Sequence, residues 1–119
     1  MKLIIAGSRT FTDYSKVKST LDHLLQNIPE DTEEIVVLCG KCRGADTLGE
    51  QYAQQYLDGV EYYPADWDTH GKAAGPIRNK EMAKNATHLV AFWDGASRGT
   101  KHMIDLAEEY GLEIRVVRV

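Results

Sequence analysis

Leu3-Ile4-Ile5-Ala6-Gly7-Ser8-Arg9-Thr10 is the stretch that decides the fold, because four apolar residues run without interruption into a glycine and a polar loop. An uninterrupted apolar run is typical of a parallel strand that helices cover on both faces. Two further runs of this kind lie at residues 35–38 and 89–92, and a loop glycine follows each of them within three residues. The chain is therefore predicted to form a sheet of parallel strands.

Helical patterns alternate with these strands. Apolar residues spaced three and four apart predict a first helix over residues 14–28, with Asp13 as its N-cap, and a second helix over 45–56. A short strand at 60–63 is followed by a long loop over 64–75 and by a short helix that starts near Pro76. A last helix ends at Gly111, and a final strand spans 113–119. This alternation, with no linker or repeat, predicts one three-layer α/β domain over residues 1–119.

The charges on the strands predict their order in the sheet. The strands at 60–63 and 113–119 contain Glu61, Arg115 and Arg118, whereas the other three are apolar throughout. Charged strands suit the edges, which favours a five-stranded parallel sheet in the order 3-2-1-4-5 of a Rossmann-like fold. The flavodoxin-like order 2-1-3-4-5 is disfavoured because it would bury the strand at 60–63 and expose the apolar strand at 35–38.

The composition is that of an ordinary globular domain. The 119 residues include 14 Lys and Arg against 18 Asp and Glu, which gives a formal charge of −4. This balance disfavours a protein that is held on duplex DNA mainly by phosphate contacts. No apolar run is long enough to span a membrane, no signal-peptide pattern is present, and two cysteines imply no disulfide framework. We therefore expect a small soluble cytoplasmic domain.

The loops that follow the strands gather most of the glycines and half of the positive charge. Ligands of open parallel sheets bind at the carboxyl ends of the strands where the strand order reverses, here between the first and fourth strands. The loops at that rim hold seven of the ten glycines and, with Arg78 and Lys101 just beyond them, seven of the 14 basic residues. Glycines let backbone N–H groups approach phosphate oxygens, and arginines add paired donors. The rim therefore predicts a phosphate or nucleotide site, although the chain has neither a P-loop nor a GxGxxG motif.

Other chemistries have weaker support. Cys39-Gly40-Lys41-Cys42 is a CxxC at a strand-to-helix junction, but it lacks a second pair of zinc ligands, and the predicted sheet order is not that of a redox domain. The four histidines lack metal-ligand spacing, so neither a metal nor a cofactor is expected. Trp67 and Trp93 adjoin rim loops. Trp67 suits stacking on a base as well as it suits packing, whereas Trp93 suits packing better.

Several motifs occur along the chain in a recognisable order. They are Gly7-Ser8-Arg9, Arg43-Gly44-Ala45-Asp46, Pro64-Ala65-Asp66-Trp67, Gly71 to Pro76 with Arg78, Asn79 and Met82, and Asp94-Gly95 with Ser97, Gly99 and Thr100. Together they resemble the SLOG superfamily, and more narrowly its YspA/YpsA-related branch, over nearly the whole chain. The resemblance implies a Rossmann-like fold and a pocket for nucleotide-derived ligands. Relatives include cytokinin-activating phosphoribohydrolases, DNA-processing proteins and sensors of ADP-ribose-like signals.

The phosphoribohydrolase motif matches this chain only in part. In those enzymes a Gly-Gly-x-Gly-Thr loop opens a helix, binds phosphate and supplies a Glu three residues after the Thr. The resemblance places that loop at 97–100 and implies phosphate binding by Gly99 and Thr100. Met103 occupies the position of the Glu, and because a thioether can neither stabilise an oxocarbenium ion nor carry a proton, the hydrolytic mechanism does not transfer. The Arg-Lys pair of those enzymes corresponds to Arg78-Asn79.

We expect the site to bind or sense a phosphorylated nucleotide or an ADP-ribose-like molecule. The first loop and the loop at 95–100 would hold phosphates, while Arg43, Asp46 and Asp66 would contact ribose or base. The expected ligand-binding residues are Gly7, Ser8, Arg9, Gly40, Arg43, Gly44, Asp46, Asp66, Trp67, Arg78, Asn79, Gly95, Ser97, Arg98, Gly99 and Thr100.

Two other functions remain open. An enzyme that cleaves an N-glycosidic bond would use Asp46, Glu50 or Asp66 as its carboxylate, with Arg78 as a further candidate; otherwise Asp46 would cap its helix or hold the loop, and Glu50 would be solvated. A single-stranded nucleic-acid binder is less favoured, because the negative charge and the sparse aromatics at the rim do not make a basic stacking groove. The edge strands and the resemblance favour a homodimer.

Overall fold

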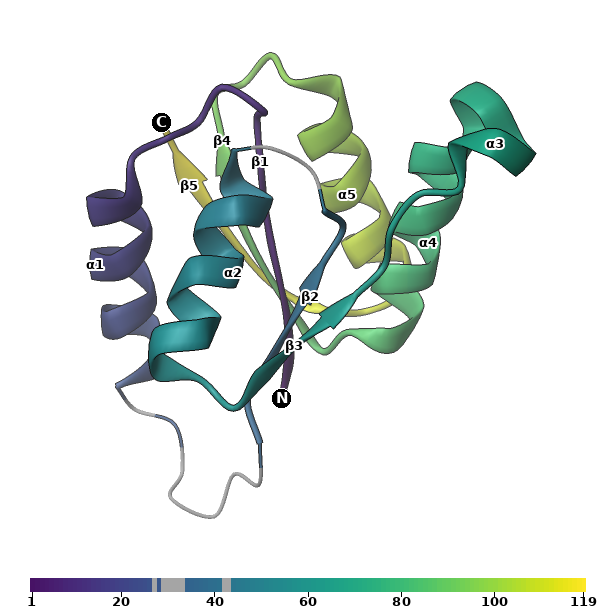
Figure 1. The fold of residues 1–119 in the computed structure, drawn as a ribbon. Coiled ribbons are helices and arrows are strands. Elements are labelled where there is room, and N and C mark those ends of the chain that lie inside the picture. Colours follow the sequence, from purple (N-terminus) through teal and green to yellow (C-terminus); the bar gives the residue numbers. More distant parts are fainter. Residues whose placement is uncertain (27, 29–33, 42–43) are drawn as a thin grey trace.

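The computed structural model describes residues 1–26, 28, 34–41 and 44–119. Figure 1 shows strands and helices alternating from end to end. The strands are β1 (Lys2–Gly7), β2 (Val36–Cys39), β3 (Gly59–Tyr62), β4 (His88–Trp93) and β5 (Glu113–Arg118). The helices are α1 (Tyr14–Leu25), α2 (Ala45–Tyr56), α3 (Trp67–His70), the 3₁₀ turn η1 (Gly71–Ala73), α4 (Ala74–Asn85) and α5 (Arg98–Glu109). All strand pairs are parallel in the order β3-β2-β1-β4-β5, which confirms the predicted Rossmann-like sheet.

Helices cover both faces of the sheet, as the continuous apolar strands predicted. Leu3 and Ile5 of β1 belong to a cluster with α1 and α2, in which Val17 and Leu21 are fully buried. Ile4, between them in sequence, belongs to the opposite cluster with α4 and α5. Because side chains alternate along a strand, an apolar residue at every position of β1 fills both cores. The two clusters make this a three-layer fold.

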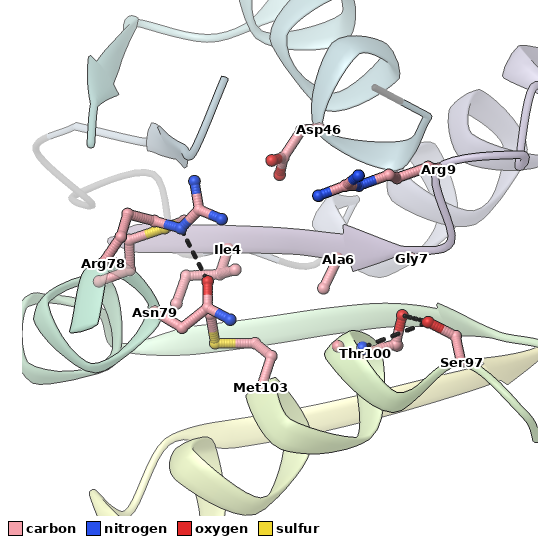
Figure 2. A pocket seen from close by; sticks show the side chains of 12 residues that line it. Ile4, Ala6, Gly7, Arg9, Asp46, Arg78, Asn79, Ser97, Thr100 and Met103 are labelled. Atoms are coloured by element: carbon pink, nitrogen blue, oxygen red, sulfur yellow. Dashed lines mark hydrogen bonds between the residues drawn. The ribbon is translucent and has the colours of Figure 1, made fainter. Parts of the chain in front are cut away.

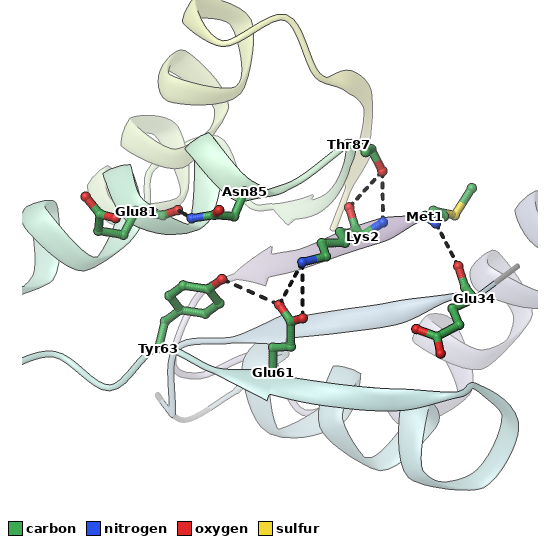
Figure 3. Close-up of polar contacts among 8 residues, drawn as sticks. All are labelled: Met1, Lys2, Glu34, Glu61, Tyr63, Glu81, Asn85 and Thr87. Atoms are coloured by element: carbon green, nitrogen blue, oxygen red, sulfur yellow. Dashed lines mark hydrogen bonds and ion pairs between the residues drawn. The ribbon is translucent and has the colours of Figure 1, made fainter.

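Hydrogen bonds at the amino ends of the strands join the sheet to the segments beside it (Figure 3). The Thr87 hydroxyl accepts from the backbone N–H of Lys2 at 2.9 Å and donates to the carbonyl of the same residue at 3.0 Å. The amino terminus of Met1 donates to the carbonyl of Glu34 at 2.7 Å. These bonds fix the register of β1 against β2 and β4, and so fix which of its residues reach the opposite end of the sheet.

The start of α1 and the end of α5 lie where the capping residues predicted them, whereas the end of α1 does not. Asp13 caps α1 by accepting from the backbone N–H of Lys16, as predicted. At the end of α5, Gly111 has φ +73°, and Leu112 donates to the carbonyl of Ala107 at 2.9 Å, so the predicted glycine terminates the helix in a Schellman motif. The prediction that α1 reaches Ile28 is wrong, because the helix ends at Leu25.

The prediction of a long loop over residues 64–75 is also wrong. Asp66 accepts from the backbone N–H of Thr69 at 3.1 Å and caps the four-residue helix α3, after which η1 leads directly into α4. The fourth helix starts at Ala74, with Pro76 in its first turn, and is as long as the other main helices. A single turn of helix has no hydrophobic period, so α3 left no pattern that distinguishes it from a loop.

Candidate functional site

A cleft of about 350 Å³ lies at the carboxyl ends of the strands, between β1, the start of α2, and the facing sides of α4 and α5 (Figure 2). This is the point where the strand order reverses, as expected for the ligand site of an open parallel sheet. The lining residues are Ile4, Ala6, Gly7, Arg9, Asp46, Arg78, Asn79, Met82, Ser97, Gly99, Thr100 and Met103.

Glycines bring α2 close to the end of β1. A Cβ on Gly7 would lie 2.7 Å from the Cβ of Ala45, and a Cβ on Gly44 would lie 2.1 Å from the carbonyl oxygen of Ser8. Gly44 also has φ +75°, a conformation that strains other residues. Gly44 is the N-cap of α2, so the expectation that Asp46 caps this helix is wrong, whereas the alternative that Asp46 holds the loop involves residues outside the described part. Asp46 lies in the first turn, where its carboxylate projects toward the space between the two arginines of the cleft (Figure 2).

The loop before α5 is held by its own side chains. Asp94 accepts from the backbone N–H groups of Ala96 and Ser97, each at 2.8 Å, and these bonds lower the pKa of its carboxyl group. Ser97 is the N-cap of α5 and accepts from the backbone N–H of Thr100. A Cβ on Gly99 would meet no atom within 4 Å, so the cleft is open above the second residue of the helix. The start of α5 thus presents backbone N–H groups and a positive dipole end to an unobstructed space.

The arginine on α4 donates to two acceptors among the described residues. Arg78 donates through Nη1 to the carbonyl of Gly40 and through Nε to Oδ1 of Asn79, the second bond being 2.8 Å long. A Cβ on Gly40 would lie 2.5 Å from Nη1 of Arg78, so this glycine makes room for the guanidinium. Arg9 reaches the cleft from the loop after β1, and no hydrogen bond joins it to the other residues drawn in Figure 2.

Among the described residues, the cleft therefore combines two guanidinium groups, a helix N-terminus, two hydroxyls and one carboxylate. Positive charge and donors of this kind suit a phosphate group. The deeper wall is apolar, since Ile4, Met82 and Met103 are each less than 5% exposed. A cleft with a polar end and an apolar end suits an amphipathic small molecule.

Eight of the predicted ligand-binding residues line this cleft. They are Gly7, Arg9, Asp46, Arg78, Asn79, Ser97, Gly99 and Thr100. Ser8, Gly40, Gly44 and Gly95 lie beside it in the supporting loops, while Arg98 is exposed and its side chain is not part of the lining. Arg43 lies outside the described residues.

Three other candidates have different surroundings. Glu50 forms an ion pair with Lys41 at 3.4 Å. Asp66 caps α3, and hydrogen bonds from the side chain and backbone of Thr69 lower the pKa of its carboxyl group. Trp67 is 50% exposed and does not line the cleft. Of the three candidate carboxylates, only Asp46 faces the cleft.

Sequence reasoning did not assign the apolar wall to the site. Ile4 and Ala6 face the cleft because they alternate with the buried residues of the other core. Their spacing of two in the strand that ends at the rim was the available signal. Met82 and Met103 follow Asn79 and Thr100 by three residues, and this spacing places each pair on one side of its helix.

The described residues include neither a reactive thiol nor a group of side chains placed to hold a metal ion. Cys39 is buried, and burial raises the pKa of its thiol to about 11, which makes a reactive thiolate scarce at neutral pH. Cys42 lies outside the described residues. Within residues 1–26, 28, 34–41 and 44–119, no group of three His, Cys, Asp or Glu side chains is placed to hold a metal ion.

A second and larger cleft, of about 660 Å³, lies near the amino ends of the strands between α1 and the sheet. Its lining is mainly apolar, with leucines of α1 and β1 beside His88, Glu113 and Arg115. It lacks a helix N-terminus and the glycine-rich loops, so the smaller cleft is the better candidate for a phosphorylated ligand.

The comparison with protein families decides what kind of protein this is. The YspA, cpYpsA-related SLOG family matches residues 1–70. The chain belongs to this family. The matched part of the SLOG chain runs from β1 to the end of α3 and includes Gly7, Arg9 and Asp46 of the cleft.

A relative of this SLOG protein is known from a bacteriophage. The gene 61 protein of Mycobacterium phage D29 is 34% identical to the chain over 119 positions, which cover 95% of this chain and 93% of the relative. No solved structure matched the SLOG chain in the comparison. No helix of the described residues is long and apolar enough to cross a membrane.

Proposed function

We propose that the cleft between β1, α4 and α5 binds a phosphorylated, nucleotide-derived small molecule. The observation that carries this proposal is the convergence of Arg9, Arg78 and the open N-terminus of α5 on one cleft at the switch point of the sheet. Membership of the SLOG family supports a nucleotide-related ligand.

The phosphate would lie over the start of α5. Gly99 leaves space for an oxygen to approach the backbone N–H groups, and the helix dipole favours a negative charge there. The hydroxyls of Ser97 and Thr100 are hydrogen-bonded to each other at 3.0 Å, which leaves the accepting hydroxyl with a proton to donate to this phosphate. Arg9 would close the site from the β1 side with paired donors.

Binding or sensing is favoured over hydrolysis by the residue that stands, according to the resemblance, at the position of the glutamate of the related hydrolases. Met103 lines the cleft where those enzymes have a glutamate, and its thioether cannot exchange a proton. Hydrolysis of an N-glycosidic bond is a second candidate function, because the carboxylate of Asp46 also faces the cleft. Incubation with nucleoside monophosphates tests this: release of free base that Asp46→Asn abolishes would establish the enzyme, and intact nucleotide supports the binding protein.

Nucleic acid is a poorer fit to the same cleft. The formal charge of −4 gives no general attraction for a polyphosphate backbone, and the exposed Trp67 lies outside the lining. A gel shift with single-stranded oligonucleotides at several salt concentrations tests this alternative, and a salt-sensitive complex would favour it over the small molecule.

A thermal-shift screen tests the proposed function. The panel contains nucleoside monophosphates, cyclic nucleotides, ADP-ribose and NAD, each paired with the matching nucleoside that lacks phosphate. A ligand at 100 times its Kd stabilises the fold by about 2.7 kcal/mol, which for a domain of this size raises the Tm by roughly 10 °C. Stabilisation by a phosphorylated member and not by its nucleoside supports the proposal, and a flat response across the panel overturns it.

A further inference from the structure

We infer that the inner end of the cleft is a slot for the heteroaromatic base of a 5′-mononucleotide and that Asn79 is the residue that recognises the base. This inference rests on the proposed function, because it takes the phosphate to lie at the start of α5. It adds an orientation for the ligand and a residue that sets its specificity.

The first step is the polarity of the cleft along its length. Arg9, Ser97 and Thr100 belong to the loops and the helix start at the rim. The other two charged groups of the lining are Asp46, in the first turn of α2, and Arg78, which lies beside Asn79 on α4. Met103 follows Thr100 by three residues and Met82 follows Asn79 by three, so each methionine lies about 4.5 Å further along its helix than that residue, at 1.5 Å per residue. Together with Ile4 they form an apolar inner wall, each with less than 5% of its surface exposed. A phosphate at the rim therefore directs the uncharged part of the ligand inward.

The second step is the orientation of the Asn79 amide. Arg78 has only donors on its guanidinium, so the atom of Asn79 that it contacts at 2.8 Å is the amide oxygen. The amide nitrogen consequently points away from Arg78 toward the middle of the cleft, as Figure 2 shows. Asn79 thus offers the ligand two N–H donors, beside the apolar wall. A ring nitrogen or carbonyl oxygen of a base is the matching acceptor.

The third step is the shape and chemistry of the slot. Thioethers such as those of Met82 and Met103 are polarizable and make favourable contacts with aromatic rings. The volume of about 350 Å³ lies at the lower end of the range for small-molecule sites, which favours one nucleotide over a dinucleotide. An apolar slot beside the N–H donors of Asn79 is selective for a heterocycle that carries an acceptor on its edge.

The experiment compares nucleotides with ribose 5-phosphate, which has the phosphate and sugar but no base. Calorimetric titration gives the Kd of ribose 5-phosphate and of AMP, GMP, CMP and UMP for the unmodified chain and for Asn79→Asp. This change keeps the oxygen that accepts from Arg78 and removes the N–H donors. Its added charge acts on the phosphate of every probe, so the measured quantity is the Kd of ribose 5-phosphate divided by that of the tightest mononucleotide.

Asn85→Asp is the matched control. Asn85 lies on the same helix, and its amide donates to the carbonyl of Glu81 at 2.8 Å, outside the cleft. The expected ratio is at least about tenfold in the unmodified chain, falls by roughly tenfold in Asn79→Asp and is unchanged in Asn85→Asp. Asn79→Ala provides a second measurement of the same ratio if the charged variant does not fold.

Two results would overturn the inference. One is a mononucleotide that binds no more tightly than ribose 5-phosphate, and the other is a ratio that Asn79→Asp and Asn79→Ala leave unchanged. In both cases binding of ribose 5-phosphate would leave the proposed phosphate site standing. If neither ribose 5-phosphate nor any mononucleotide binds, the inference fails, and the response of the full thermal-shift panel decides whether the proposed function fails with it.

Discussion

Placing a carboxylate at Gly99 separates the stability of the fold from the binding of a phosphate. Gly99 is the second residue of α5, and a Cβ there meets no atom within 4 Å, so Gly99→Asp introduces no steric clash. Glycine in a helix is less favourable than aspartate by about 0.3 kcal/mol, and an acidic side chain near a helix N-terminus is stabilising by about 0.3–1 kcal/mol. The ligand-free variant should therefore be more stable by about 1 kcal/mol, which raises the Tm by roughly 3–6 °C.

The same substitution should abolish most of the affinity for a phosphorylated ligand. A carboxylate about 5 Å from a phosphate charge, at an effective dielectric constant of about 20, repels it by roughly 3 kcal/mol. That energy corresponds to a loss of affinity of roughly 200-fold. The assay is calorimetric titration with the tightest-binding nucleotide of the thermal-shift panel, at low salt so that screening is small.

Gly99→Ala is the control for Gly99→Asp. It gains helix stability without adding charge, and its methyl group enters open space, so its affinity should stay within a few-fold of the unmodified chain. A Gly99→Asp protein that binds the nucleotide as tightly as Gly99→Ala does would refute a phosphate at the start of α5.

Further substitutions test the parts of the site one at a time. Arg9→Ala should raise the Kd about ten- to a hundredfold in a titration, since a hydrogen bond to a charged group contributes roughly 1.5–3 kcal/mol. Arg98 lies outside the lining, so Arg98→Ala should change the Kd by less than threefold. Gly44→Ala should lower the free energy of unfolding, measured in urea, by about 3 kcal/mol or more, because φ is +75° and the new Cβ meets backbone atoms. A Cβ on Gly59 meets no atom within 4 Å, so Gly59→Ala should change this free energy by less than about 1 kcal/mol. The lowered pKa of Asp94 means that its carboxylate stabilises the fold fully above the unfolded pKa of about 3.9. Asp94→Asn should thus be less stable than the unmodified chain at pH 7 in thermal melts, with the difference shrinking as the pH falls below 4; a constant difference would exclude the charge as its cause.

Much of the fold could be predicted from the sequence because the central and the edge strands differ in their content of apolar and charged residues. Apolar residues at every position of β1 and β4 indicated helices on both faces, and the charges of β3 and β5 placed those strands at the edges. What the sequence did not show was the path between β3 and β4. The helix α3 has one turn and buries no residue, so neither periodicity nor composition distinguished it from a loop.

The location of the candidate site was more predictable than its composition. Glycines and arginines clustered after the strands, and eight of the expected residues meet in one cleft. The rotation of a helix against the sheet decides which of two adjacent residues faces the cleft. Gly99 therefore lines the cleft, whereas its neighbour Arg98 does not. The role of Gly44 also became clear only with the position of Ser8, since the close contact joins two loops that are distant in the sequence.

The most direct test of the account locates the ligand on the molecule. Two-dimensional ¹H–¹⁵N spectra of the labelled protein are recorded during titration with the tightest-binding nucleotide of the panel. The account predicts that the largest shifts belong to the backbone amides of Arg9, Gly99 and Thr100, which surround the smaller cleft. Largest shifts at Leu24 and His88, which line the larger cleft at the amino ends of the strands, would contradict it.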